Sequence, residues 1–96
     1  EQKVESIRIK NLNTGKEREL NVKAIFIEIG LIPNTGFICE HLDINQSNEI
    51  IIDENNQTSI EGIFAAGDVT DIKDKQIIVS AAEGAKAALR ANEYLS

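Results

Sequence analysis

The sequence has a single cysteine, Cys39, among its 96 residues, and it has neither methionine nor tryptophan. One cysteine excludes an intramolecular disulfide, a C-x-x-C redox pair and a multi-cysteine zinc site within these residues. We expect Cys39 to be an inert, partly buried thiol, because free cysteine commonly packs as a small hydrophobic side chain. The lone histidine, His41, has no nucleophile arranged with it, and a surface or packing role is expected.

The sequence also lacks a long apolar run, a signal peptide and an excess of basic residues. No run approaches the roughly 18 apolar residues of a membrane span. The formal net charge of -6 argues against nucleic acid and anionic membranes as partners. A hydrophobic content of 42% is ordinary for a globular protein. We therefore expect at most one small, soluble, cytoplasmic domain, and because the first residue is Glu1, we expect a chain cut from something longer.

Two groups of acidic residues have spacings that could indicate a metal-binding site. Residues 43–54 place oxygen-bearing side chains at several positions of an EF-hand loop, but Asn48 stands where the loop needs glycine and Ile51 cannot ligate. We favour a polar turn leading into a strand. Asp68, Asp71 and Asp74 would align only on a helix, and the sequence around them indicates a loop. No metal site is expected.

The first third of the chain predicts a β-hairpin followed by a buried strand. Residues 3–10 and 17–23 alternate apolar and polar side chains, and a turn at residues 13–16 joins them, with Gly15 supplying a positive φ. Residues 24–29 are more continuously apolar, which is typical of a strand covered on both faces. This chain is too short to supply the neighbouring strands.

The middle of the chain predicts turns and one short strand. Pro33 ends the preceding strand, and residues 35–42 form a short helical turn. Residues 49–53 are a β-branched strand. Asn48, just before it, tolerates a left-handed backbone better than most residues.

The stretch from Thr58 to Asp68 carries the strongest pattern for a binding site. Residues 63–66 are a short apolar run between Gly62 and Gly67, as in a buried strand. Gly67 allows a sharp turn and a close approach to a ligand, because it has no Cβ. Asp68 then stands at the carboxyl end of that strand, where α/β sheets hold ligands. Its carboxylate can accept hydrogen bonds from hydroxyls of a sugar or ribityl chain.

From Gln76 onward the apolar periodicity is helical. One predicted apolar stripe, expected to pack against a sheet, comprises Ile78, Ala81, Ala82, Ala85, Ala88 and Leu89. At the helix N-terminus, unpaired backbone N–H groups of Gln76 and Ile77 favour an electron-rich ligand edge. Gly84 costs about 1 kcal/mol in a helix relative to alanine. We expect it to accommodate another backbone passing close by.

Three segments together resemble the thioredoxin reductase family, the class II pyridine nucleotide-disulfide oxidoreductases. They are I-G-L-I-P-N-T at residues 29–35, T-S-I-E-G-I-F-A-A-G-D at 58–68 and K-Q-I-I-V-S-A-A-E-G-A-K-A-A at 75–88. Within this family, the sequences of the three segments are most similar to those of the flavoprotein subunits of alkyl hydroperoxide reductases. Essentially the whole chain is covered.

The resemblance implies an α/β fold, as part of a flavoprotein with two dinucleotide-binding domains. Residues 1–33 would be the tail of its NAD(P)H domain, a hairpin plus strand, and residues 34–96 would close its FAD domain. Asp68 would hydrogen-bond the FAD ribityl chain, and residues 75–77 would border the isoalloxazine pyrimidine ring. Many relatives have arginine where Lys75 stands. The implied FAD contacts are Thr58, Gly62, Ile63, Phe64, Ala65, Ala66, Gly67, Asp68, Lys75, Gln76 and Ile77.

The family passes electrons from NADPH or NADH through FAD to a disulfide. The resemblance thus implies a homodimeric enzyme with a thioredoxin-like or peroxiredoxin-linked partner. These 96 residues contain no G-x-G-x-x-G motif for either nucleotide and no C-x-x-C, so alone they are expected to be inactive and to bind FAD weakly or not at all. Two alternatives stay open: a ferredoxin- or oxygen-linked flavoprotein reductase without a redox cysteine pair, and a non-catalytic binding or interaction module.

Overall fold

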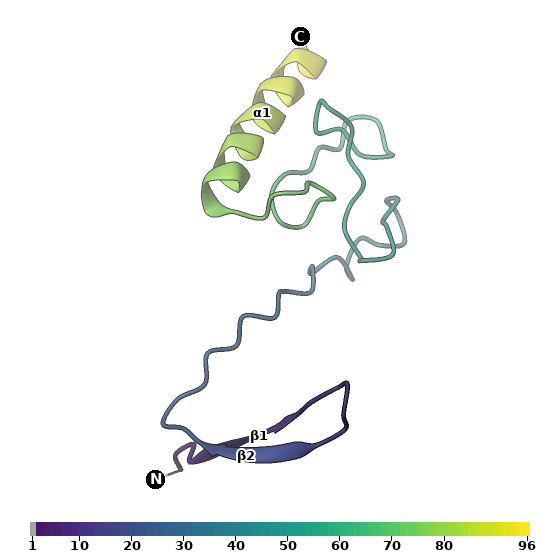
Figure 1. Ribbon diagram of the computed structural model, residues 1–96. Coiled ribbons are helices and arrows are strands. Elements are labelled where there is room, and N and C mark those ends of the chain that lie inside the picture. Colours follow the sequence, from purple (N-terminus) through teal and green to yellow (C-terminus); the bar gives the residue numbers. More distant parts are fainter. Residues whose placement is uncertain (1) are drawn as a thin grey trace. The chain divides into compact units, whose positions relative to one another are not determined.

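The computed structural model describes residues 2–96, which contain two strands and one helix (Figure 1). Strand β1 spans Ser6–Lys10, strand β2 spans Glu17–Asn21 and helix α1 spans Ile77–Leu95. The chain divides into two compact units, Glu1–Gly30 and Leu31–Ser96. The first holds the hairpin and the second holds the helix, so the fold is a small α/β arrangement.

Strands β1 and β2 form the predicted antiparallel hairpin, with Ser6 opposite Asn21 and Lys10 opposite Glu17. Gly15 in the connecting turn has φ 74°, as its position predicts. The Asn11 side chain supports the same turn, because its Oδ1 accepts the backbone N–H of Asn13 at 2.9 Å. The hairpin prediction is therefore confirmed, although both strands are shorter than the alternating pattern.

The predicted buried strand at residues 24–29 is not a strand in this structure. Within residues 2–96 this segment pairs with no other segment. Phe26 is 89% exposed and Ile29 is 93% exposed. The prediction of two covered faces is wrong for these residues, since a strand of this composition needs neighbouring strands that residues 2–96 do not supply.

The second unit is built mainly from loops that meet at Ile50. The Ile50 N–H donates to Val69 O at 2.8 Å, and Ile50 O accepts the Asp71 N–H at 3.0 Å. Leu42 and Ile50 are its buried apolar side chains, at 5% exposure each. The segments 49–53 and 63–66, which were predicted to be strands, form only isolated β-bridges. Ile50 bridges to Ile44 and Thr70, and Phe64 bridges to Gln57. Too few neighbouring strands are present to extend these bridges into a sheet.

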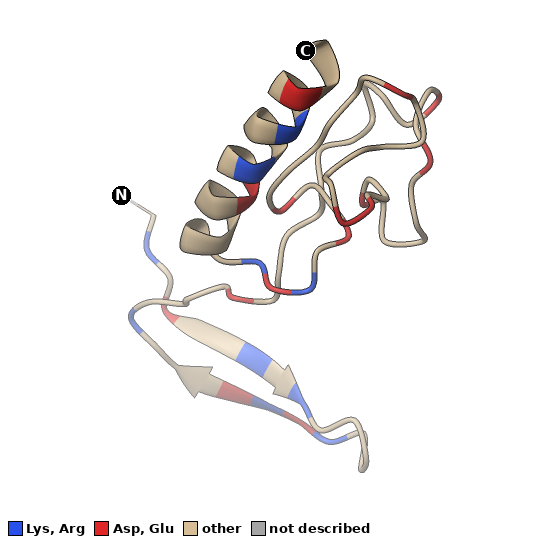
Figure 2. Ribbon diagram, turned by 90° about the horizontal axis from the view of Figure 1, so that it is seen from above, with Lys and Arg blue, Asp and Glu red and all other residues tan. Residues whose placement is uncertain are grey.

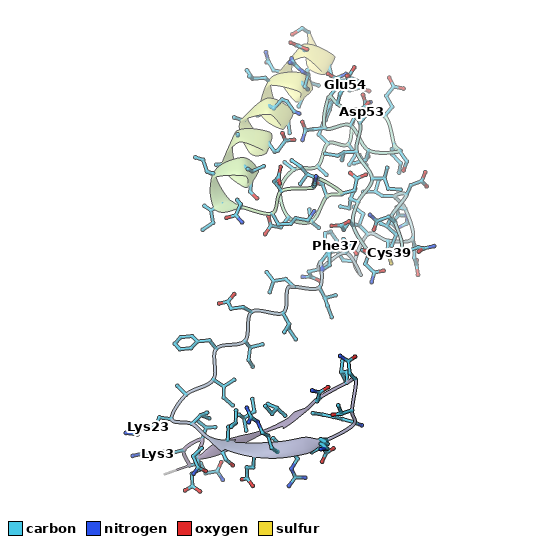
Figure 3. All side chains as sticks on the ribbon, in the orientation of Figure 1. Lys3, Lys23, Phe37, Cys39, Asp53 and Glu54 are labelled. Carbon is cyan, nitrogen blue, oxygen red and sulfur yellow. The ribbon has the colours of Figure 1, made fainter. Side chains whose placement is uncertain are left out.

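Residues 35–42 form successive turns, as predicted. The Cys39 N–H donates to Thr35 O at 2.9 Å, and the Leu42 N–H donates to Ile38 O at 3.2 Å. Asn48 has φ 61°, which confirms the expected left-handed conformation. Cys39, labelled in Figure 3, is exposed, so the expectation of a partly buried thiol is wrong. Its thiol remains at the surface of its own turn, where Sγ donates to Gly36 O at 3.5 Å.

Helix α1 begins at Ile77, with Gln76 as its N-cap residue. No helix within residues 2–96 is both long and apolar enough to cross a membrane. Its packing face differs from the predicted apolar stripe, every member of which is exposed. The half-buried side chains of α1 are instead Val79, Ser80, Glu83, Lys86, Ala87, Arg90 and Ala91. Figure 2 shows that α1 carries both acidic and basic residues. The helix contacts the loops through hydrogen bonds of Ser80 and Glu83 and through Tyr94, none of which belongs to the predicted stripe.

Gly84 lies on the open side of α1. A Cβ built at this position would have no heavy atom within 4 Å. The expectation of a backbone passing close to Gly84 is therefore wrong within the described residues.

Candidate functional site

Gly67 forms a sharp, buried turn directly before Asp68. Its φ of 84° belongs to the left-handed region that favours glycine. An added Cβ would lie 3.4 Å from Cβ and Oγ of Ser80. The turn is closed from the other side, because the Thr70 hydroxyl donates to Gly67 O at 2.7 Å and the Thr70 N–H donates at 3.0 Å. The backbone conformation thus favours glycine at position 67, and an added Cβ would be in van der Waals contact with Ser80.

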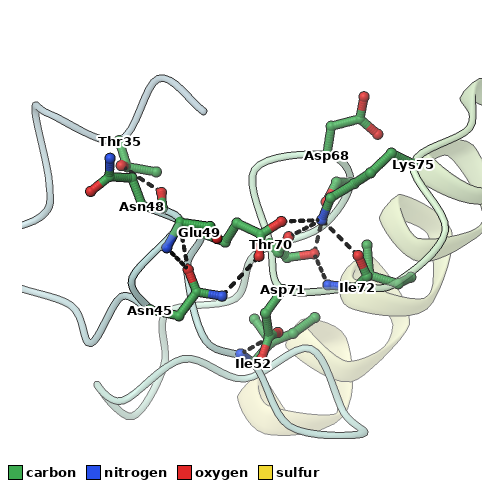
Figure 4. A network of polar contacts seen from close by, with 12 residues as sticks. Thr35, Asn45, Asn48, Glu49, Ile52, Asp68, Thr70, Asp71, Ile72 and Lys75 are labelled. Carbon is green, nitrogen blue, oxygen red and sulfur yellow. Dashed lines mark hydrogen bonds and ion pairs between the residues drawn. The ribbon is translucent and has the colours of Figure 1, made fainter. Parts of the chain in front are cut away.

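Asp68 is exposed and is held by the first turn of α1. Ser80 Oγ donates to Asp68 Oδ1 at 2.9 Å. No other hydrogen bond to the Asp68 carboxylate is formed within residues 2–96. Figure 4 shows the carboxylate pointing away from the polar network around Lys75. An oriented carboxylate with a free oxygen can accept a hydroxyl from a ligand.

The N-terminus of α1 is open. Gln76 makes no side-chain capping hydrogen bond, and the first turn contains no acidic residue. Ile77 is 92% exposed and Ile78 is 76% exposed. The first backbone N–H groups of a helix lack intrahelical acceptors and lie at the positive end of its dipole. This end of α1 can therefore donate hydrogen bonds to an electron-rich group.

The ammonium of Lys75 points toward the backbone of the loop that precedes it. Nζ donates to the carbonyl oxygens of Thr70 and Ile72, the latter at 2.6 Å, and forms a 2.8 Å ion pair with Glu49 Oε2 (Figure 4). Glu49 also accepts a 2.8 Å hydrogen bond from Asn45 Nδ2. The hydrogen bond from Lys75, and secondarily that from Asn45, holds the pKa of Glu49 below its ordinary value. Glu49 and Asn45 are therefore engaged within the fold.

The segment from Thr58 to Ala66 packs at the other end of α1. Thr58 is 9% exposed, and its hydroxyl donates to Ile63 O at 2.9 Å. Gly62 has φ 85°, and an added Cβ would lie 3.2 Å from the Tyr94 hydroxyl oxygen. Phe64 meets Tyr94 edge to face, with ring centroids 6.2 Å apart. The structure therefore brings the residues predicted from 58 to 68 onto two ends of one helix.

Asn56 and Glu83 connect these two ends, and sequence reasoning missed them. Asn56 is fully buried with φ 60°, and its Nδ2 donates to Glu83 Oε2 at 2.7 Å and to Ala65 O at 3.1 Å. The hydrogen bond from Asn56 lowers the pKa of Glu83, and Lys86 adds a 3.2 Å ion pair. The only sequence signal was an asparagine in a turn-rich stretch, which also fits an ordinary solvent-exposed turn.

The acidic set at 68, 71 and 74 does not converge. Asp71 Oδ1 accepts the Ile52 N–H at 3.2 Å, whereas Asp68 binds Ser80. Among residues 2–96 there is no group of three or more histidine, cysteine or acidic side chains placed to hold a metal ion. The carboxylates of Asp68 and Asp71 thus serve separate parts of the loop.

Known proteins resemble this chain in sequence. The profile of the family described as pyridine nucleotide-disulphide oxidoreductase matches residues 1–89. The chain is 52% identical over 95 residues to an alkyl hydroperoxide reductase subunit of Staphylococcus aureus, and 45% identical over 92 residues to one of Staphylococcus epidermidis. The match covers 99% of this chain and 19% of the Staphylococcus aureus protein, and 96% and 18% for Staphylococcus epidermidis.

Solved structures agree with the sequence matches. The Lactococcus lactis thioredoxin reductase superposes with a TM-score of 0.86 at 35% identity, covering 95% of this chain and 30% of that protein. The thioredoxin reductase of T. acidophilum gives a TM-score of 0.84 at 33% identity, covering 95% and 31%. Profile, sequence and fold agree over nearly the whole length, and the chain belongs to the pyridine nucleotide-disulphide oxidoreductase family, with thioredoxin reductases and alkyl hydroperoxide reductase subunits as relatives.

Proposed function

We propose that this chain closes the FAD site of a flavin-dependent disulfide reductase similar to the flavoprotein of alkyl hydroperoxide reductase. The observation that carries the proposal is the 52% identity to the Staphylococcus aureus subunit across 99% of this chain. The chain spans 19% of that relative's length, so it works as one segment of a larger enzyme in this proposal. Residues 1–33 then belong to the NAD(P)H domain and residues 34–96 to the FAD domain.

Two features around Asp68 support a flavin contact in this proposal. The oxygen of Asp68 that Ser80 leaves free accepts a ribityl hydroxyl, and the left-handed turn at Gly67 leads directly into this exposed carboxylate. The uncapped N–H groups at the start of α1, next to Gln76 and Ile77, face the pyrimidine edge. The acceptor, Asp68, precedes the short loop of residues 69–75, and the donors at the start of α1 follow it. A ligand with hydroxyls at one end and carbonyls at the other could use both.

The other predicted FAD contacts support that loop. Thr58 and the backbone of residues 62–66 are fixed by the Thr58–Ile63 hydrogen bond and by the Phe64–Tyr94 contact. Lys75 contributes its backbone, since its ammonium is engaged with Thr70, Ile72 and Glu49. The exposed apolar residues 24–29 supply a strand to the sheet of the NAD(P)H domain.

When bound, FAD supplies the redox chemistry between a nicotinamide nucleotide and a disulfide. The electron donor is NADPH or NADH, and the disulfide belongs to a thioredoxin-like or peroxiredoxin-linked protein. We further propose a cytoplasmic homodimer. Within these steps, residues 58–77 bind and orient the flavin and perform no proton or thiol chemistry themselves.

The test is to read the coding frame upstream of Glu1 and to purify its product. The proposal expects two G-x-G-x-x-G motifs and a C-x-x-C in that frame, a yellow protein with bound FAD, and anaerobic bleaching of the flavin by NADH or NADPH. A frame with both glycine motifs but no cysteine pair would select a ferredoxin- or oxygen-linked reductase. A colourless product that stays folded without flavin would overturn the proposal in favour of a binding module.

A further inference from the structure

The loop between the two halves of the proposed flavin site is short, and within residues 2–96 no backbone N–H of its residues 72–76 donates to a backbone carbonyl. It runs from Asp68, whose carboxylate is held by Ser80, to Gln76, the N-cap of α1. Residues 71–76 belong to neither helix nor strand. The hydrogen bond from Ser80 sets the distance from the carboxylate to the first turn of α1, whereas the backbone path of residues 70–76 depends on how this loop is tied down.

Lys75 ties the loop down from inside. An ammonium has three N–H donors, and the structure gives Nζ three acceptors, namely the carbonyl oxygens of Thr70 and Ile72 and the carboxylate of Glu49. The side chain of Lys75 is 32% exposed and that of Glu49 is 19% exposed, so the pair is partly shielded from water. With its donors used, the ammonium has none left for a ligand.

Glu49 fixes the loop to the rest of the unit. Its other carboxylate oxygen, Oε1, accepts from Asn45 Nδ2 at 2.8 Å, and the next residue, Ile50, lies in the buried core and bonds to Val69. Glu49 thus connects the ammonium of Lys75 with the buried segment at Ile50. Figure 4 shows these contacts converging between the two segments.

We propose that Lys75 is a positioning residue whose ammonium clamps residues 70–75 onto Glu49 and so fixes the backbone path that leads from Asp68 into the N-terminus of α1. The inference rests on the proposed flavin site and adds an indirect role to it. Lys75 acts through the loop and does not place its charge on the flavin. Glu49, which is not one of the predicted contact residues, takes part in the same positioning of the loop.

The test compares Lys75→Met, Glu49→Gln and the double variant in the full-length flavoprotein. FAD affinity is measured by fluorescence titration after flavin removal, and the midpoint potential of the bound flavin is measured on the loaded protein. The matched control is Lys73→Met, because Lys73 lies in the same loop and its side chain has no hydrogen bond or ion pair within residues 2–96.

A clamp predicts that Lys75→Met and Glu49→Gln act in the same direction. Each weakens FAD binding by about tenfold, because each removes a charge-assisted contact, and the double variant is no weaker than Lys75→Met alone. The two variants also shift the midpoint potential with the same sign. Lys73→Met stays within about twofold of the parent protein, and Lys75→Arg restores part of the loss because it keeps the charge without the compact donor geometry.

If Lys75 instead acted on the flavin directly through its charge, Lys75→Met and Glu49→Gln would shift the midpoint potential in opposite directions. Removing a cation and removing an anion near a flavin shift its potential in opposite directions. Opposite shifts, additive losses in the double variant, or an unchanged affinity in Lys75→Met would each overturn the clamp. Hydrogen exchange of the backbone amides of residues 70–76 in the flavin-free protein supplies an independent readout, which Lys75→Met must accelerate and Lys73→Met must not.

The exchange measurement separates the two proposals. A parent protein that binds no flavin refutes the flavin site, whereas the exchange result still decides whether Lys75 clamps the loop. A parent protein that binds flavin, with unchanged exchange in Lys75→Met, refutes the clamp alone.

Discussion

Ser80 Oγ donates a 2.9 Å hydrogen bond to Asp68 Oδ1, and this contact joins the first turn of α1 to the carboxylate that follows Gly67. It places a hydrogen-bond acceptor beside a helix N-terminus that has no side-chain cap. In the proposed flavin site, these two features contribute an acceptor and donors from different elements. A single hydroxyl on α1 thus orients the acidic residue of the proposed flavin site.

Replacing Ser80 with alanine is expected to weaken FAD binding by the full-length protein. The lost hydrogen bond frees the Asp68 carboxylate to rotate, and a net contribution of about 1 kcal/mol corresponds to about fivefold in affinity. Ser80→Thr keeps the hydroxyl and should stay close to the parent value. Fluorescence titration with FAD measures both, and equal losses in the two variants would show that packing against Gly67 is responsible instead.

Two glycine-to-alanine substitutions should have opposite effects on stability. Gly67→Ala forces a Cβ into a left-handed conformation against Ser80 and should lower the free energy of unfolding by about 1–2 kcal/mol. Gly84→Ala adds a methyl group to an open helix position and should raise it by about 1 kcal/mol. Urea unfolding of the full-length variants, followed by circular dichroism, tests both. A destabilising Gly84→Ala would reveal a segment outside these 96 residues packed on that side of α1.

Asn56→Ala is expected to be strongly destabilising. It removes the hydrogen bonds to Glu83 and Ala65 at a fully buried position and leaves alanine at φ 60°. The expected loss is about 3 kcal/mol in the free energy of unfolding. Asn56→Gly accepts the backbone conformation and isolates the hydrogen-bond contribution, so it should lose less. A thermal shift within error of the parent protein for Asn56→Ala would contradict the connecting role of this residue.

Acid should destabilise the protein partly through Glu49. Its pKa is held below the ordinary value of 4.5, first by the hydrogen bond from Lys75, so folding favours the charged form. This stabilisation is complete above pH 4.5 and is lost as pH falls through the lower pKa of the folded state. Glu49→Gln should therefore flatten the acid side of the pH–stability curve. The matched control is Glu61→Gln, because the Glu61 carboxylate makes no ion pair within residues 2–96; an equal flattening in both variants would contradict the assignment.

Local rules predicted the turns and the helix of this chain well. Gly15 and Asn48 adopt the left-handed conformations that their turns require, and α1 begins one residue after the predicted start. The tight turn at Gly67 was predicted because glycine follows an apolar run, and its φ of 84° confirms the turn, whereas the ligand contact of Asp68 stays a prediction. These features depend on residues close together in sequence.

Contacts between distant residues could not be predicted in the same way. The apolar stripe of α1 predicted packing through Ala81 and Ala85, whereas the helix is held through Ser80 and Glu83. Hydrophobic periodicity locates an apolar face but not the partner that covers it, and polar contacts such as Asn56 to Glu83 leave no periodic signal. The strand at residues 24–29 failed for a related reason, since its pairing needs strands that these residues do not include.

The most direct test of the flavin assignment is FAD affinity in two aspartate variants of the full-length protein. Asp68 presents an oriented carboxylate, whereas Asp74 lies in the same loop and its side chain makes no hydrogen bond or ion pair within residues 2–96. We predict that Asp68→Ala weakens FAD binding by at least about tenfold and that Asp74→Ala leaves it within about twofold. Equal affinities for the parent protein and Asp68→Ala would contradict the assignment of this chain to the FAD site.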